Sequence, residues 1–135
     1  MLSMKYIIIP FIIALISQFI KVMIEYIRHK KISISRFVDG MGGMPSTHSA
    51  LVSSTSTLIY LECGMSPLFT VTLIFSLIVI YDSMGIRYES GKQAEIINEM
   101  AGSNLEEKIG HRPIEVLIGT ILGVISTILI YLIIK

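Results

Sequence analysis

The chain has 135 residues, of which 53% are hydrophobic and only 16% charged, and this balance excludes an ordinary soluble domain of this size. The formal net charge of +1 gives no indication of nucleic-acid binding, and the single cysteine, Cys63, excludes an internal disulfide. We therefore expect one membrane-embedded, all-α domain over residues 1–135 and no nucleic-acid partner.

Four apolar segments are expected to cross the membrane, since a helix needs about 20 apolar residues to span the hydrocarbon core. The second is rich in Ser and Thr, whose hydroxyls suit close helix packing, and the third is short. Ser66 and Pro67 are typical of a helix start, so these two segments should form a helical hairpin. The expected spans are Tyr6 to Arg28, Ser46 to Cys63, Pro67 to Tyr81 and Pro113 to Ile134.

Two polar connections separate these spans, one from His29 to Met44 and one from Asp82 to Arg112. In the second, Ile96, Ile97 and Met100 stand among charged residues. This pattern predicts a short amphipathic helix that lies on the membrane surface. The expected fold is therefore an integral membrane four-helix bundle with a surface helix between helices 3 and 4.

Basic residues gather in or beside the two polar connections. Of eleven Lys and Arg, only Lys5 and Lys135 lie elsewhere. With four spans, both connections lie on one face, which the positive-inside rule makes cytoplasmic, with both termini outside. The residues of this cytoplasmic set are Lys21, Arg28, Lys30, Lys31, Arg36, Arg87, Lys92, Lys108 and Arg112.

The first span carries a polar stripe, because Gln18, Lys21, Glu25 and Arg28 are spaced three, four and three residues apart. Long basic side chains near a helix end can simply reach for lipid headgroups. Ionisable groups inside a membrane helix, however, usually face the interior of a bundle and mark a functional cavity.

The segment "GMGGMPSTHSA", residues 40–50, begins the second span. Pro45, Ser46 and Thr47 are typical of a helix N-terminus, and the glycines allow tight turns. Free N–H groups there form an anion site, although an ordinary capped helix would have the same pattern. His48 lies one turn inside the span, where it could donate or accept a proton.

The segment "GHRPIEV" begins the fourth span, with Pro113 at the first helical position. The four-residue spacing brings His111 and Glu115 together. The carboxylate can then hold one imidazole nitrogen protonated and leave the other free as a nucleophile. Alternatively, Glu115 caps the helix and His111 is a surface residue.

The expected topology brings these polar residues to the same side of the membrane. Two histidines, a neighbouring carboxylate, basic side chains and free N–H groups are the groups needed for phosphoryl transfer through histidine. They come from four different helix ends. The first carries Lys21 and Arg28, the second His48, the third Arg87, and the fourth His111 with Glu115.

The sequence resembles the type 2 phosphatidate phosphatase superfamily, relatives of the vanadium haloperoxidases, and specifically its divergent bacterial branch of short membrane proteins. The first superfamily block is Lys, six residues, Arg-Pro. Lys21 and Arg28 keep this spacing, and His29 replaces the proline. The second block is Pro-Ser-Gly-His, which is Pro45-Ser46-Thr47-His48 here.

The third block is Ser-Arg, five residues, His, three residues, Asp. His111 and Glu115 keep the last spacing, with Glu in place of Asp. The Ser-Arg pair departs from the pattern: Arg87 is the nearest upstream candidate, further from His111 than usual, and Lys92 and Arg112 are alternatives. The three blocks lie between positions 21 and 115, most of the chain.

The resemblance implies a role for each matching residue. His111 would attack phosphorus and form a phosphohistidine, Glu115 would orient it, and His48 would protonate the leaving alkoxide. No metal or other cofactor is implied. The equatorial phosphate oxygens would be held by Lys21, Arg28, Arg87 and backbone N–H groups near Ser46 and Thr47.

We therefore expect a membrane phosphatase for a lipid phosphate, such as phosphatidylglycerophosphate, phosphatidate or an isoprenoid phosphate. The lateral surface of four helices is compatible with a homodimer. One alternative is a non-catalytic membrane protein that binds anionic headgroups or a partner and does not need both histidines. Another is a metal-dependent phosphatase, although the residues available to it match no standard metal spacing. Those residues are Asp82, Glu89, His111 and Glu115.

Overall fold

The structure is a computed structural model that describes residues 4–30, 43–105, 107 and 110–134, without the side chains of Arg28 and His29. Over these residues the chain is helical and has no strand, which confirms the expected all-α class. Each expected span corresponds to a helix within a few residues. The helices are α1 (Lys5–His29), α3 (Thr47–Cys63), α4 (Pro67–Met84), α5 (Ile86–Ala101) and α6 (Pro113–Ile134).

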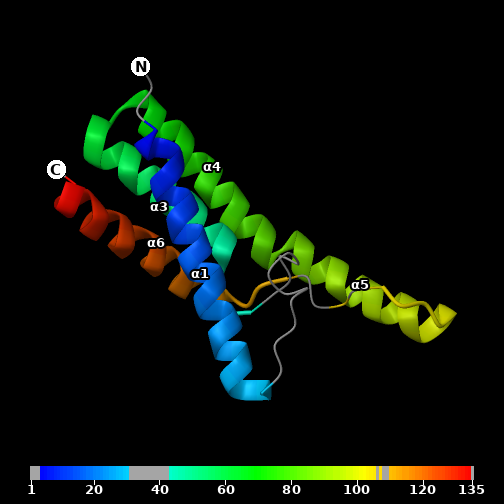
Figure 1. Ribbon diagram of the computed structural model, residues 1–135. Coiled ribbons are helices and arrows are strands. Elements are labelled where there is room, and N and C mark those ends of the chain that lie inside the picture. Colours follow the sequence, from blue (N-terminus) through cyan, green and yellow to red (C-terminus); the bar gives the residue numbers. More distant parts are fainter. Residues whose placement is uncertain (1–3, 31–42, 106, 108–109, 135) are drawn as a thin grey trace.

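Helix α3 lies at the centre of the bundle and packs against α1, α4 and α6 (Figure 1). Helices α1 and α6 also contact each other, whereas α4 contacts α6 only slightly. As expected, Ser66 caps α4 and Pro67 begins it. The apolar core is small and consists of Ile9, Ile13, Ala50 and Leu58.

Buried hydroxyls and glycines bring α3 and α6 close together. The Thr127 hydroxyl donates to Ser54 Oγ at 2.7 Å. A Cβ atom added at Gly119 would collide with the backbone carbonyl oxygen of Ser46, and one at Gly123 with the Ser53 hydroxyl. Small residues spaced four apart are typical of close helix packing in membranes. The hydroxyl-rich α3 is therefore a packing element as well as a carrier of polar residues.

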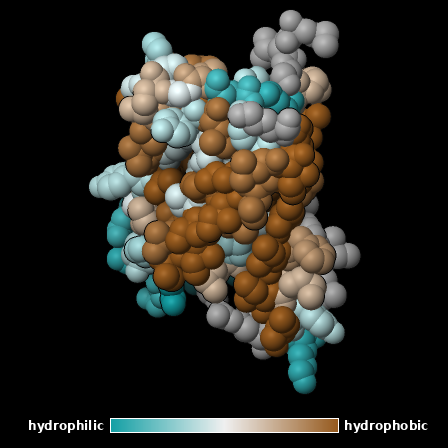
Figure 2. All heavy atoms as spheres, turned by 90° about the vertical axis from the view of Figure 1, so that its left-hand side faces the viewer, coloured by the Kyte–Doolittle hydropathy of each residue, from teal (hydrophilic) through white to brown (hydrophobic). Residues whose placement is uncertain are grey.

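Three of the described helical segments are long and apolar enough to cross a membrane: Lys5–Ile27, Pro67–Ala101 and Pro113–Ile134. Helix α3 has 17 residues and many hydroxyls, and α1, α4 and α6 pack around it. Figure 2 shows apolar side chains covering most of one face of the molecule, with polar side chains toward its edges. This is a membrane protein in which α1, α4 and α6 supply most of the apolar surface.

The N-terminus of α1 and the C-termini of α3 and α6 meet at one end of the bundle. Lys5 Nζ lies 2.6 Å from Glu62 Oε1, and the Tyr131 hydroxyl donates to the Leu61 carbonyl at 3.3 Å. Figure 1 accordingly shows the N and C ends at this end. The helix ends that lead into the two polar connections therefore lie at the opposite end.

Helix α5 is the expected amphipathic helix, but it continues the direction of α4 and projects beyond the bundle (Figure 1). The physical reason is that hydrogen bonding continues through Gly85: its N–H donates to Tyr81 O at 2.9 Å, and Glu89 N–H donates to Gly85 O at 3.0 Å. A 35-residue segment is roughly 50 Å long, whereas the hydrocarbon core is about 30 Å thick. The α4–α5 segment is therefore longer than one crossing of the hydrocarbon core requires.

Candidate active site

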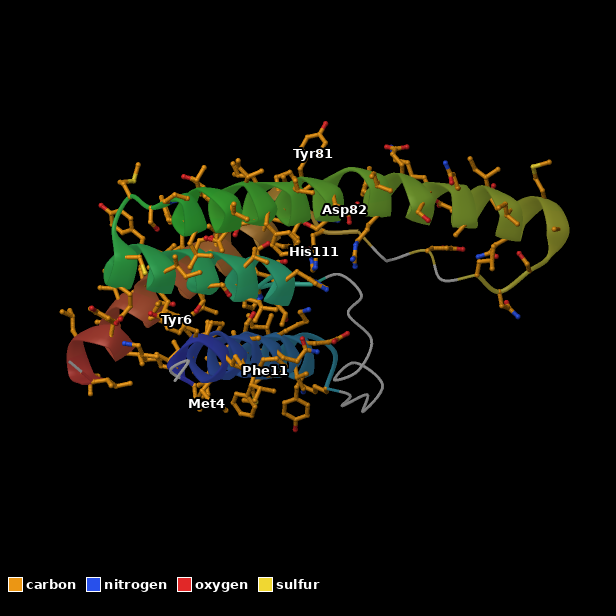
Figure 3. All side chains as sticks on the ribbon, turned by 90° about the horizontal axis from the view of Figure 1, so that it is seen from above. Met4, Tyr6, Phe11, Tyr81, Asp82 and His111 are labelled. Carbon is orange, nitrogen blue, oxygen red and sulfur yellow. The ribbon has the colours of Figure 1, made fainter. Side chains whose placement is uncertain are left out.

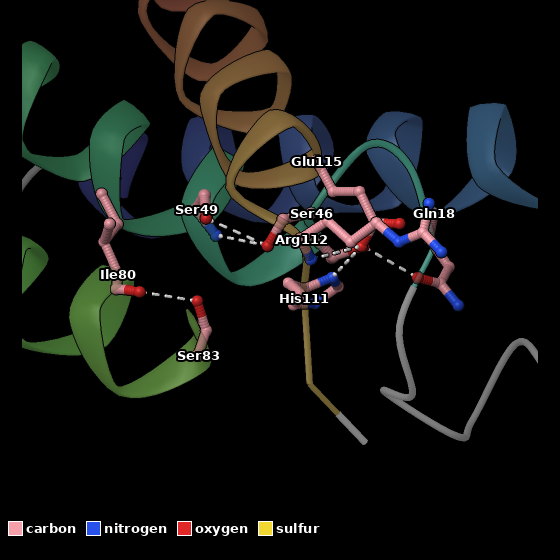
Figure 4. A network of polar contacts seen from close by, with 9 residues as sticks. Gln18, Ser46, Ser49, Ile80, Ser83, His111, Arg112 and Glu115 are labelled. Carbon is pink, nitrogen blue, oxygen red and sulfur yellow. Dashed lines mark hydrogen bonds and ion pairs between the residues drawn. The ribbon is translucent and has the colours of Figure 1, made fainter. Parts of the chain in front are cut away.

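The start of α6 orients His111. Pro113 begins this helix and Glu115 lies in its first turn, as expected. His111 Nδ1 is 3.1 Å from Glu115 Oε2, and the same oxygen accepts the backbone N–H of Arg112 at 3.2 Å (Figure 4). The carboxylate therefore caps the helix and also orients the imidazole. His111 is only 2% exposed, so it is not a surface residue.

A second contact fixes the His111 backbone. Its N–H donates to the Ser83 carbonyl at 3.0 Å, near the C-terminus of α4. Its Nε2 is buried and has no hydrogen-bond partner among the described residues. A buried polar atom without a partner is costly and often marks a chemical role. Because Nδ1 is bound to the carboxylate, Nε2 is the nitrogen left to react.

His48 faces His111 from the first turn of α3. The ring centroids are 6.4 Å apart and the rings meet edge-on, with 63° between their planes. His48 is half-buried. Two histidines that are 63 positions apart in the sequence are therefore neighbours at the end of the bundle where the polar connections lie.

The N-terminus of α3 is held against α6 through Ser46. This residue is the N-cap: its Oγ accepts the Ser49 N–H at 3.4 Å and the Ser49 hydroxyl at 3.0 Å. Its own N–H donates to the Glu115 carbonyl at 3.0 Å, so it is occupied within the protein. The first-turn N–H groups of Thr47 and His48 have no acceptor in the part of the chain that the structure describes. These two groups are the ones that can bind an anion at this helix end.

Helix α1 contributes Gln18 and Lys21, two members of its polar stripe, to the same place. The Thr47 hydroxyl donates to Gln18 Oε1 at 2.8 Å, and Lys21 is 5% exposed. Gly43 has a φ of +90°, and a Cβ atom there would lie 3.5 Å from Lys21 Cγ and Cδ. Only glycine adopts this conformation readily, so Gly43 lets the chain pass closely over Lys21. The Arg28 side chain, expected in the same stripe, lies outside the described part.

Arg87 lies in the first turn of α5, directly after the end of α4. Its Nε is 3.1 Å from Asp82 Oδ2, at the end of α4. Figure 3 shows Asp82 and His111 at the end of the bundle from which α5 projects, with Tyr81 pointing away. Lys92, one of the alternatives, instead pairs with Glu89 at 3.2 Å and lies over the Tyr88 ring on exposed helix surface.

The electrostatic environment favours neutral His111. Burial lowers the pKa of His111 below its ordinary value of 6.5. The hydrogen bond that His111 Nδ1–H donates to Glu115 opposes this, and the positive charges of Lys21 and Arg87 lower the pKa further. Neutral imidazole is the form that can act as a nucleophile. Because the charges of Lys21 and Arg87 affect the His111 pKa, both residues act on the ring electrostatically.

The residues of the metal-dependent alternative do not form a ligand cluster. Among the described residues, no group of three or more His, Cys, Asp or Glu side chains is placed to hold a metal ion. Asp82 pairs with Arg87, and Glu89 pairs with Lys92. The chemistry that this arrangement can support is nucleophilic attack by an oriented imidazole on an anion held by basic groups.

Two residues that shape the site were missed in the sequence. The carbonyl of Ser83 fixes the His111 backbone, and no local pattern distinguishes this serine from Ser76, the other serine of α4. Gly119 lets the Ser46 backbone approach α6. Its four-residue spacing from Gly123 is a recognisable sign of close helix packing and could have indicated it.

Comparison with known proteins found a matching family and a membrane-protein relative. Residues 2–126 match the Divergent PAP2 family. A relative from Bacillus subtilis (strain 168), named "Uncharacterized membrane protein YuiD", is 36% identical over 136 aligned positions, which cover 84% of this chain and 85% of the relative. No solved structure matches the chain.

Proposed function

Because this chain belongs to the Divergent PAP2 family, we propose that it is a metal-independent phosphatase that hydrolyses a lipid phosphate monoester through a phosphohistidine at His111. The observation that carries the proposal is the state of the His111 ring. Its Nδ1 is bound to Glu115, and its buried Nε2 has no partner among the described residues. This ring also faces a second histidine, His48.

The first half-reaction transfers the phosphoryl group to the protein. The Nε2 lone pair of His111 attacks phosphorus, a P–N bond forms and the P–O ester bond breaks. Protonated His48 gives its proton to the departing alkoxide. In the second half-reaction a water molecule attacks phosphorus, His48 takes a proton from it, and the P–N bond breaks to release inorganic phosphate.

Charge stabilisation at the equatorial phosphate oxygens supplies most of the catalysis in such a transfer. The positive charges of Lys21 and Arg87 act on His111, and the N–H groups of Thr47 and His48 at the N-terminus of α3 have no acceptor among the described residues. Ser46 supports this helix end as its cap. Arg28 completes the set in the proposal, on the strength of its spacing from Lys21.

The proposal extends to the orientation of the protein. Nine of eleven basic residues lie in or beside the polar connections, which makes that end of the bundle cytoplasmic and places both termini outside. The whole chain acts as a single domain. A homodimer would cover part of the apolar lateral surface.

The decisive experiment measures phosphate release by the purified protein in detergent, with phosphatidylglycerophosphate, phosphatidate and an isoprenoid phosphate. We expect release from at least one of them, unchanged in chelator and inhibited by vanadate, which mimics pentacoordinate phosphorus. Activity lost in chelator and restored by magnesium would support the metal-dependent alternative. Absence of turnover, with headgroup binding that depends on the basic residues but on neither histidine, would support the binding protein.

A further inference from the structure

A groove of about 470 Å³ runs between α3, α4 and α6. It exists because α4 packs on α3 and contacts α6 only slightly, so the two outer helices stand apart. Its lining includes Ser53 and Thr57 from α3, Leu77 and Ile80 from α4, and Thr120 and Val124 from α6. The groove is open on its side, toward the space that lipid occupies in a membrane.

We infer that this α3–α4–α6 groove holds a hydrocarbon chain of the phosphate ester whose phosphate binds at His111 and His48. The substrate is then a long-chain lipid phosphate that reaches the site sideways from the bilayer. This inference rests on the proposed function, because it assigns the chain of the same substrate whose headgroup reacts at the histidines.

The position of the groove supports this assignment. Its end nearest the histidines is formed by Ser53, Ile80 and Thr120. Ser53 lies five positions after His48, Ile80 lies three before Ser83, and Thr120 lies five after Glu115. Each is therefore roughly 5–8 Å deeper along its helix than the residue near the phosphate site. The Ser83 hydroxyl donates to the Ile80 carbonyl at 2.7 Å, and the Ser83 carbonyl accepts the His111 N–H. The groove therefore begins about one to one and a half turns below the phosphate site on all three helices.

Four of the hydroxyl groups that line the groove already have hydrogen-bond partners within the protein. Ser53 Oγ donates to the Ser49 carbonyl at 2.6 Å, and Thr120 Oγ1 donates to the Val116 carbonyl at 2.9 Å. Ser56 and Ser76 share a hydrogen bond at 2.8 Å. A hydrocarbon chain can lie against hydroxyls that are already satisfied without leaving a polar group unpaired.

A second groove provides a contrast. It lies between α1 and α4, has a volume of about 210 Å³, and is lined by Tyr6, Pro10 and Thr55 among others. Tyr6 is within hydrogen-bond distance of Glu62, so this groove lies toward the end of the bundle away from the histidines. It is smaller and its α1 wall is remote from the phosphate site, which makes it a control surface of similar chemistry.

The two grooves allow a matched pair of variants on one helix. Thr57 lines the α3–α4–α6 groove and Thr55 lines the α1–α4 groove, and both side chains are half-buried. We expect Thr57→Trp to lower kcat/KM for phosphatidate by about tenfold or more, as when a substrate is displaced from its productive position. Hydrolysis of nitrophenyl phosphate, which has no long chain, should be unchanged. Thr55→Trp should leave the ratio of the two activities at its wild-type value.

A binding measurement keeps the inference testable if Thr57→Trp fails to fold. The chain contains no tryptophan, so Ile128→Trp, at the far end of the groove, gives a fluorescence signal of its own. A phosphonate analogue of phosphatidate with brominated chains, at low content in unbrominated phosphatidylcholine vesicles, should quench this signal saturably. Vanadate, which competes for the phosphate site, should reverse the quenching.

The outcomes separate the inference from the proposed function. Suppose that wild-type protein releases phosphate from both phosphatidate and nitrophenyl phosphate. If Thr57→Trp then lowers the two activities equally, or lowers neither of them, the groove does not hold the chain. Quenching that vanadate leaves unchanged would also overturn the inference, because it would report ordinary lipid contact. If wild-type protein hydrolyses neither ester, the proposed function fails, and the fluorescence measurement still decides whether a phosphonate lipid occupies the groove.

Discussion

His48 and His111 face each other edge-on, 6.4 Å apart between ring centroids, from the first turn of α3 and the residues just before α6. They are held there by backbone contacts from two other places. Ser46, two residues before His48, donates its N–H to the Glu115 carbonyl, and Ser83 accepts the His111 N–H. The pair is therefore fixed by the packing of three helices, and a phosphoryl group bound to one ring would lie within reach of the other.

The two histidines should respond differently to the leaving group. His111→Ala should abolish turnover of every phosphate ester, because no neighbouring side chain can replace the covalent step. His48→Ala should lose activity on a lipid phosphate by roughly 10²–10⁴-fold, the usual contribution of general acid catalysis. It should lose much less on nitrophenyl phosphate, whose leaving group needs little protonation. Steady-state rates on the two substrates measure this, and a leaving-group dependence that followed His111 instead would contradict the assigned roles.

The acid limb of the pH profile should reflect neutral His111. Activity that requires the neutral ring is lost as the pH falls through its folded pKa, and burial lowers that pKa below 6.5. The hydrogen bond to the Glu115 carboxylate and its negative charge raise this pKa, so Glu115→Gln should move the acid limb to still lower pH while reducing kcat. Ionisation of the substrate is the same for wild type and variant. A difference between their pH profiles of kcat/KM therefore arises from ionisation of a group in the protein. A shift of the limb to higher pH would contradict this electrostatic account.

Gly119 should be needed for the geometry of the site as well as for packing. A methyl group there would collide with the Ser46 carbonyl, a backbone atom that cannot turn aside. We expect Gly119→Ala to destabilise the protein by about 1–3 kcal/mol, as overpacking usually does, and to lower kcat by displacing the N-terminus of α3. Thermal unfolding in detergent and phosphate release would measure the two effects. The control is Ile121→Ala, which removes an exposed side chain from the same helix and should leave kcat unchanged.

Much of the fold could be predicted because its signals are local. The apolar segments, the Ser66 cap and Pro113 each mark a helix without reference to the rest of the chain, and each helix was found within a few residues. The direction of α5 could not be predicted in this way. Gly85 could equally end a helix or continue it, and the hydrogen bonds that decided the matter depend on a backbone conformation that composition does not specify.

The contact between His111 and Glu115 could be predicted from their spacing, whereas the longer-range contacts of the candidate site could not. The four-residue spacing was enough to bring His111 to Glu115, since a helix turn dictates it. The same sequence suggested that the Ser46 N–H would be open to an anion, whereas it donates to the Glu115 carbonyl. That contact joins residues 69 positions apart and depends on how closely α6 approaches α3, which Gly119 permits.

Labelling of cysteines should test the orientation of the bundle. Cys63 is exposed at the end away from the histidines, so an impermeable thiol reagent should reach it in intact cells if that end is outside. Glu99→Cys on α5, in a Cys63→Ser background, should react with a permeable reagent but not with an impermeable one. Labelling of position 99 by the impermeable reagent would remove the argument that the active site faces the cytoplasm.

Vanadate inhibition should distinguish Arg87 from Lys92, two of the three candidates for the third basic residue at the phosphate beside Lys21 and Arg28. Arg87 is favoured because its charge helps to lower the pKa of His111, whereas Lys92 lies five residues further along α5 and pairs with Glu89. A hydrogen bond to a charged group contributes about 1.5–3 kcal/mol, so Arg87→Ala should raise the concentration of vanadate needed for half-inhibition by roughly 10–100-fold. Lys92→Ala is the matched control on the same helix and should leave this concentration within about twofold of the wild-type value, since exposed ion pairs contribute little. Equal effects of the two substitutions would mean that α5 acts through its overall charge, and a larger effect of Lys92→Ala would transfer the assignment from Arg87 to Lys92.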